Sequence, residues 1–181
     1  MTRIAIQSGR AVALAGLDLD ALALPMFRGR VQPRGVAGHV DWRLCGRIAH
    51  LLRADRFRGD AGEALLMPAS GRIGPQRVFL FGLGPARAPS GEARSDLLTI
   101  VEALVQAGAD RHGVGFPVAP GAPPDAEQAA AVEWASAWLE AVATHRGGLD
   151  EVVLLDEDGR LEREAARLRE RARDLGLTWG A

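Results

Sequence analysis

The chain has 181 residues, 48% of them hydrophobic and 25% charged, which is ordinary for one globular domain large enough to bury a core. Its net charge of -1 gives no reason to expect binding to nucleic acid or to an anionic membrane surface. Lysine is absent, which excludes a lysine Schiff base, a lysine nucleophile and the lysine of a phosphate-binding P-loop.

The first half of the chain reads as short strands separated by turns. Apolar residues in alternating or continuous runs predict strands over residues 2–7, 21–24 and 63–67. We expect the first to lie at a sheet edge, with residues 11–14 as a hairpin partner. Pro25 is expected to end the second strand, because proline cannot donate to a strand ladder.

One helix is predicted in this half. Asp41 is a favourable N-cap for a helix that runs to about residue 54, with Trp42 and Cys45 on its apolar stripe. The stretch before it, residues 27–38, mixes arginine with glycine and proline, which is typical of an exposed loop.

Residues 77–84 read RVFLFGLG and organise the rest of the chain. Val78 to Phe81 predicts a strand buried on both faces, at the centre of the sheet. The short connection from the strand at 63–67 predicts that the two strands pair antiparallel. Gly82-Leu83-Gly84 then turns the chain before Ser90, the expected cap of the next helix. Ligands of open α/β sheets bind beyond the carboxyl ends of such strands, so this turn is a candidate rim of a site.

Strands and helices alternate through the second half. Strands are predicted over residues 112–118, 151–156 and 177–179. Asp125 is expected to cap a long helix between the first two, and a last helix follows Asp158. This alternation indicates βαβ units, and therefore a three-layer α/β fold with a mixed, mainly parallel sheet flanked by helices.

Cys45 is the only cysteine, so the chain forms no internal disulfide and suits a reducing compartment. Its place on the predicted apolar stripe indicates a buried, inert thiol. The first residues lack the long apolar core of a signal peptide, and no run reaches membrane-spanning length. We therefore expect a single domain over residues 1–181, in the cytoplasm, with no membrane partner.

The residues that carry chemistry do not assemble into a reaction centre. The four histidines are scattered and lack the spacing of a helical metal site, so we interpret them as ordinary surface or helix-end residues: His39, His50, His112 and His145. Gly82-Leu83-Gly84 before a capped helix could cradle a phosphate, although a tight structural turn fits the same residues. Asp156-Glu157-Asp158 could bind a cation, but three acids before a helix more often serve as a cap.

Trp134 and Trp138 lie four residues apart on the long predicted helix. Two interpretations stay open. The rings complete the core, or they form a contact patch for another protein chain.

Two parts of the sequence carry a family resemblance. FRGDAGE at residues 57–63, followed by RVFLFGLG at 77–84, resembles the N-terminal domain of leucyl (cytosol) aminopeptidases. VGFP at residues 114–117, through the helix at Asp125 to VVLLD at 152–156, resembles a macro domain. The two agree, because the resemblance to the aminopeptidase domain implies a macro-like fold.

The resemblance also implies what the chain lacks. The aminopeptidases hold two metal ions, a lysine and several carboxylates in a separate C-terminal domain, and none of these motifs occurs here. Macro domains bind ADP-ribose through a glycine-rich loop, which here corresponds to residues 118–124. That loop has one glycine, Gly121, and three prolines that cannot donate a hydrogen bond.

The leading hypothesis is a non-catalytic binding, regulatory or assembly module that works through protein contacts and needs no cofactor. Its partner would be a second copy or a separate aminopeptidase-type catalytic subunit. The alternative is a small-ligand module for a nucleotide or an ADP-ribose-like phosphate compound, with a candidate rim of Gly82, Leu83, Gly84, Ala119 and Gly121. A third hypothesis is an accessory part of a split aminopeptidase system.

Overall fold

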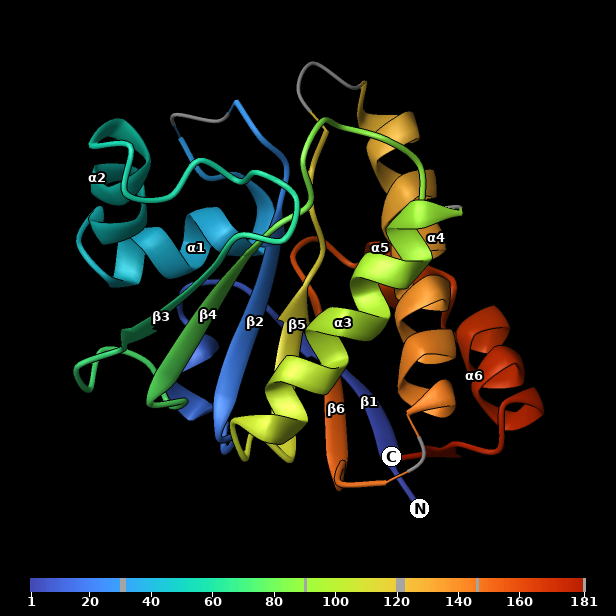
Figure 1. The fold of residues 1–181 in the computed structure, drawn as a ribbon. Helices are drawn as coiled ribbons and strands as arrows, with labels where there is room; N and C mark the ends of the chain where they lie inside the picture. The colour runs from blue at the N-terminus through green and yellow to red at the C-terminus, as the bar shows by residue number, and fades with distance from the viewer. Residues whose placement is uncertain (30–31, 90, 120–122, 146, 181) are drawn as a thin grey trace.

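The computed structural model describes residues 1–29, 32–89, 91–119, 123–145 and 147–180. A seven-stranded sheet runs through it in the order β3-β4-β2-β5-β6-β1-β7 (Figure 1). Every pairing is parallel except that of β3 with β4. The strands are β1 (Arg3–Ser8), β2 (Ala21–Met26), β3 (Ala64–Pro68), β4 (Arg77–Gly82), β5 (Arg111–Gly115), β6 (Glu151–Asp156) and β7 (Thr178–Trp179). The mixed, mainly parallel sheet and the antiparallel pair are confirmed.

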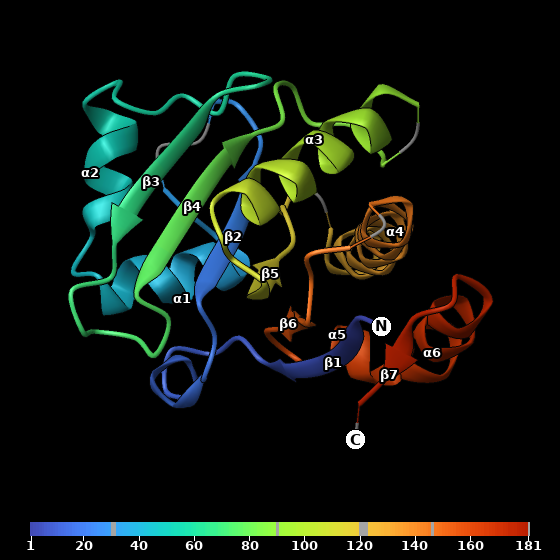
Figure 2. The same cartoon turned by 60° about the horizontal axis from the view of Figure 1, so that its bottom comes forward.

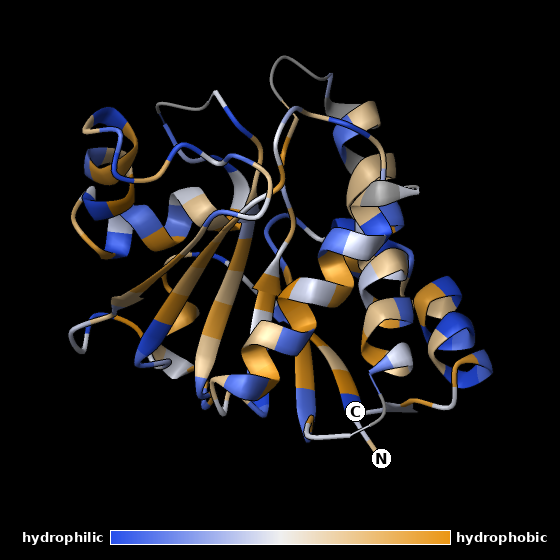
Figure 3. Cartoon of the chain, in the orientation of Figure 1, coloured by the Kyte–Doolittle hydropathy of each residue, from blue (hydrophilic) through white to orange (hydrophobic). Residues whose placement is uncertain are grey.

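Helices cover both faces of this sheet (Figures 1 and 2). They are α1 (Gly35–Arg43), α2 (Arg47–Arg53), α3 (Glu92–Gln106), α4 (Pro124–Thr144), α5 (Arg160–Arg163) and α6 (Ala165–Asp174), with a 3-10 turn at Leu14–Gly16. One apolar cluster joins α3, α4 and α6 to the sheet, and the other joins α1 and α2 to the opposite face. Figure 3 shows β6 carrying mostly hydrophobic residues between these layers. Within the described part of the chain, no helix is both long and apolar enough to cross a lipid bilayer.

Three strand expectations are corrected. β4 is buried on both faces but lies beside the edge strand β3, and β5 occupies the centre of the sheet. β1 is not an edge strand, because it pairs with both β6 and β7, and the chain after it forms the 3-10 turn. β2 continues through Pro25 to Met26. Its pairing with β5 ends at Ala23, so proline costs no hydrogen bond on that side.

The helix expected from Asp41 is two helices with a break between them. α1 ends at Arg43, and the chain turns through two residues with positive φ, Cys45 at 56° and Gly46 at 77°, before α2 starts. Asp41 does act as a cap, but from within α1: its Oδ1 accepts the N–H groups of Ile48 (2.7 Å) and Ala49 (3.0 Å) in the first turn of α2.

Candidate functional site

The Gly82-Leu83-Gly84 turn is bonded to the protein's own backbone. Its three N–H groups donate to carbonyl oxygens 2.7–2.9 Å away, those of Glu63, Met26 and Gly59 respectively. A Cβ at position 82 would overlap the carbonyl oxygen of Asp60, so glycine is needed there for close packing. All three donors are used within the chain, which agrees with the interpretation of these residues as a tight structural turn.

The partner of this turn is the loop at residues 58–62, which one carboxylate holds in place. Glu63 Oε2 accepts the N–H groups of Arg58 (2.9 Å), Gly59 (2.8 Å) and Asp60 (3.1 Å). In the motif FRGDAGE, the Glu63 carboxylate therefore fixes the backbone of the loop that packs against the end of β4. The sequence interpretation missed the role of Glu63, and the signal was an acid directly after two closely spaced glycines.

Between the described residues, the crevice beyond the carboxyl ends of β5 and β6, where open α/β sheets place a ligand, holds two small cavities. They have volumes of about 40 and 20 Å³ and lie beside Phe116, Pro117 and Val118, whereas a wider hollow of about 400 Å³ lies over the ends of β1 and β6. The two small cavities leave room for no more than about a few water molecules. Val36, at the start of α1, occupies the space: a Cβ at Gly115 would lie 2.7 Å from its side chain.

The lining of the larger of these two cavities is acidic. It includes Glu127, Asp156, Glu157 and Asp158 against one guanidinium, that of Arg160. Burial lowers the pKa of Arg160, but hydrogen bonds from its guanidinium to Asp158 and Glu127 outweigh this and leave the pKa raised. Such a lining repels a diphosphate rather than attracting it.

The acidic run after β6 caps a helix, as one of its two interpretations stated. Asp156 Oδ1 accepts the N–H of Arg160 (2.9 Å), and Oδ2 accepts that of Glu162 (3.0 Å). Ala119 is half-buried against the core, and Gly121 lies outside the described residues.

Trp134 and Trp138 complete the core. Their exposed fractions are 1% and 0%, and their rings meet Phe27 and His112 edge-on, each at 5.8 Å between centroids. Neither ring reaches the surface of this chain, so the contact-patch interpretation is corrected. The buried stripe of α4 is wider than the helical period of its apolar residues suggested. One side of α4 packs against the sheet and α3, and another side packs against α6.

His112 is likewise buried, not a surface residue. Its Nδ1 lies 3.2 Å from the carbonyl oxygen of Ala109, and burial lowers its pKa to about 4. His39 lies elsewhere, with Nε2 3.8 Å from Glu157 Oε1. Among the residues that the structure describes, no three histidine, cysteine, aspartate or glutamate side chains converge as a metal site.

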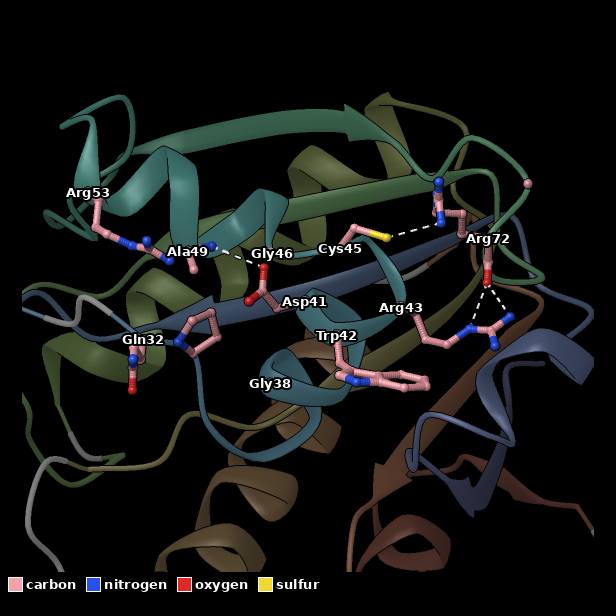
Figure 4. A pocket seen from close by; sticks show the side chains of 12 residues that line it. Gln32, Gly38, Asp41, Trp42, Arg43, Cys45, Gly46, Ala49, Arg53 and Arg72 are labelled. Atoms are coloured by element: carbon pink, nitrogen blue, oxygen red, sulfur yellow. Dashed lines mark hydrogen bonds between the residues drawn. The ribbon is translucent and has the colours of Figure 1, made fainter.

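A wide surface hollow between described residues lies over α1 and α2, away from the crevice. This groove has a volume of about 950 Å³ and is lined by Asp41, Trp42, Arg43, Cys45, Arg53 and Arg72, among others (Figure 4). Trp42 is 69% exposed and Cys45 is exposed, which corrects their expected burial. The break at residues 44–46 is the reason, since it interrupts the helical stripe on which both were placed.

Two arginines brace the groove, and neither forms an ion pair with a carboxylate of the described residues. Arg43 donates from Nε (2.9 Å) and Nη2 (2.6 Å) to the carbonyl oxygen of Arg72, and Arg72 Nη1 lies 3.1 Å from Cys45 Sγ. These contacts join α1 to the connection between β3 and β4. Sequence reasoning did not single out this groove, because its walls are distant in the chain.

The N-terminal domain of the cytosol aminopeptidase family matches residues 23–137, which is more than half of the chain. The "Probable cytosol aminopeptidase" of Alkaliphilus metalliredigens (strain QYMF) is 33% identical over 76 residues, 41% of this chain and 15% of that protein. Its counterpart in Alkaliphilus oremlandii (strain OhILAs) is 29% identical over 65 residues and is covered to 13%. The chain thus matches only a small part of these relatives.

Solved structures show the fold. A mutant of tomato leucine aminopeptidase superposes with a TM-score of 0.63 at 16% identity, covering 93% of this chain and 35% of that one. A mutant Oceanobacillus iheyensis macrodomain with ADPR gives 0.62 at 14% identity, covering 95% and 91%. The Trypanosoma brucei macrodomain in complex with ADP gives 0.60 at 15%, covering 96% and 69%. The macro-like α/β fold is therefore confirmed, and the chain belongs to the cytosol aminopeptidase family through that family's N-terminal domain.

Proposed function

We propose that this chain is a non-catalytic assembly module of the cytoplasm, working through contacts with other protein chains. The observation that carries the proposal is the family match: it falls on the N-terminal domain, in relatives of which the chain covers 15% or less. The partner is a catalytic aminopeptidase subunit encoded apart, or further copies of the same chain.

The geometry of the crevice supports a role through surfaces rather than through a bound small molecule. The donors of the Gly82-Leu83-Gly84 turn are used internally, the two cavities beyond β5 and β6 are small, and the larger of them has an acidic lining. The surface instead offers an exposed tryptophan, Trp42, in a groove with three arginines. Tryptophan and arginine are the residue types enriched at the energetic centres of protein interfaces.

Light scattering tests the proposal directly. We expect the measured mass to be a multiple of the 19.2 kDa of one chain, or, after mixing with a catalytic cytosol aminopeptidase lacking this domain, the mass of a joint complex. A strict monomer in both samples would contradict the assembly role. Metal-dependent cleavage of a leucyl amide by the purified chain alone would contradict the non-catalytic part.

The phosphate-ligand hypothesis has one supporting fact, that solved macrodomains of the same fold carry ADPR or ADP. A thermal-shift series with ADP-ribose, ADP and inorganic phosphate separates it from the assembly role. A true ligand at about 100 times its dissociation constant adds about 2.7 kcal/mol of stability. We expect no shift with any of the three, because the two described cavities beyond β5 and β6 are small and the N–H groups of the Gly82-Leu83-Gly84 turn are used within the chain.

A further inference from the structure

Charge is distributed very unevenly along this nearly neutral chain. Residues 28–58 contain eight arginines and two aspartates, a net charge of +6 with histidine neutral. The whole chain carries -1, so the remaining residues carry -7. Most of the positive stretch is α1, α2 and the turns on either side, which lie together on one side of the molecule (Figure 1).

Much of this positive charge is not neutralised within the chain. Three arginines of this stretch form ion pairs: Arg28 and Arg58 with Asp60, and Arg34 with Glu127. Among the described residues, five others on or beside α1 and α2 have no carboxylate within ion-pair distance: Arg43, Arg47, Arg53, Arg56 and Arg72. Three of these arginines line the groove: Arg43, Arg53 and Arg72.

The groove also presents an apolar anchor. Trp42 is 69% exposed on α1, next to Arg43, with Arg53 beyond Asp41 on the other side (Figure 4). A large exposed ring costs solvation free energy unless a partner covers it. A guanidinium and an indole at one rim suit a ligand that has both carboxylates and apolar side chains.

The shape of the charge distribution favours a short acidic polypeptide over a nucleic acid. Duplex DNA carries about one charge per 1.7 Å and continues past any single groove. The residues outside 28–58 carry -7 in sum, so they offer such a polyanion no net positive charge. A polypeptide segment of a few residues can end where the arginines end, and the Asp41 carboxylate in the groove can accept its backbone N–H groups.

We infer that the groove over α1 and α2 binds an acidic segment of a partner protein, with Arg53 and Arg72 contacting its carboxylates and Trp42 its apolar side chains. The inference rests on the proposed function and names the surface and the partner chemistry through which assembly occurs. It does not use the crevice beyond β5 and β6.

The test measures the binding of a fluorescent peptide to the full chain by anisotropy. The probe is a synthetic glutamate-rich peptide with one leucine, and its control replaces every glutamate with glutamine. We expect the glutamate peptide to bind and the glutamine peptide not to. Reversing two charges, Arg53→Glu with Arg72→Glu, should weaken binding at least about tenfold, and Trp42→Ala by a similar factor.

Arg173→Glu is the matched control, because Arg173 is an exposed helical arginine on α6 and has no carboxylate partner among the described residues. It should leave the affinity within about twofold, since it is far from the groove. Equal weakening by Arg173→Glu, or no binding of the glutamate peptide at low salt, would overturn the inference. So would tighter binding of an oligonucleotide of equal charge, which would assign the groove to nucleic acid.

Light scattering on the same variants keeps this inference apart from the assembly proposal. Loss of the partner complex with Arg53→Glu and Arg72→Glu, with circular dichroism unchanged, supports both. Persistence of that complex overturns the groove as the docking surface and leaves assembly standing. A homomultimer that becomes monomeric in the same variant identifies the occupant as a second copy and overturns the assignment to a different protein.

Discussion

At the scale of single residues, His112 links stability to pH. Its folded pKa of about 4 lies below the ordinary 6.5, because burial disfavours the charged ring. Between those values the unfolded chain binds a proton that the native chain does not. The neutral His112 therefore contributes about 3 kcal/mol to the free energy of unfolding above about pH 6.5, and this contribution is lost as the pH falls towards 4.

Urea unfolding at several pH values checks this. His112→Phe keeps a ring against Trp138 but cannot titrate, so its stability should fall less steeply from pH 6.5 to 4 than that of the wild type. His50→Gln, at an exposed position, should keep the wild-type slope. Identical slopes for the wild type and His112→Phe would show that this histidine is not the titrating group.

Gly82 is the second residue whose role is steric. Alanine there would push its Cβ into the carbonyl of Asp60, so we expect Gly82→Ala to lower the free energy of unfolding by about 3 kcal/mol. Gly16→Ala is the control, because a Cβ there meets nothing within 4 Å. Equal stability of the two variants in denaturant titrations would contradict the close packing of the turn.

At the scale of elements, the N-terminus of α2 depends on a side chain from α1. Asp41→Ala removes the acceptor of two N–H groups and should cost about 1 to 2 kcal/mol. Asp41→Asn keeps an acceptor oxygen and should lose less than half of that amount. Chemical denaturation distinguishes the two, and an equal loss would show that the negative charge rather than the hydrogen bond is what matters.

The elements that sequence predicted well are those with strong local signals. β4, β6 and α4 follow continuous apolar runs or a long apolar stripe, and each appears close to its expected place. The prediction of one continuous helix from Asp41 is wrong, because the break after α1 requires positive φ at Cys45 and Gly46. Of these two residues, only the glycine is a type that indicates positive φ in a sequence. Trp42 and Cys45 were misplaced by the same error, and so the groove could not be predicted.

At the scale of the whole molecule, the order of the strands could not be read from the sequence. β1 pairs with β6, which lies about 148 residues later, and no local pattern encodes such a partner. The surroundings of the candidate rim at the carboxyl edge could not be read from the sequence for a related reason. Its space is taken by Val36 from α1 and its donors by residues 26, 59 and 63, all of which reach it only through tertiary packing.

The sheet also sets the size of the folding unit. The family match covers residues 23–137, but β1, β6 and β7 lie outside it and complete the sheet. A fragment of residues 23–137 would expose β5 as an edge and would end α4 just before Trp138, which is fully buried in the whole chain. We expect thermal melts monitored by circular dichroism to show one cooperative transition for the full chain and none for the fragment. A cooperative fragment would contradict a single domain over residues 1–181.

The exposed thiol of Cys45 gives the molecule a built-in attachment point. It is the chain's only cysteine and it lines the groove beside Arg72. A maleimide carrying a photoactivated crosslinker would therefore attach at one site without any engineering of the protein. Irradiation would fix that probe to whatever polypeptide fills the groove, and mass spectrometry would then read out the sequence of the trapped segment.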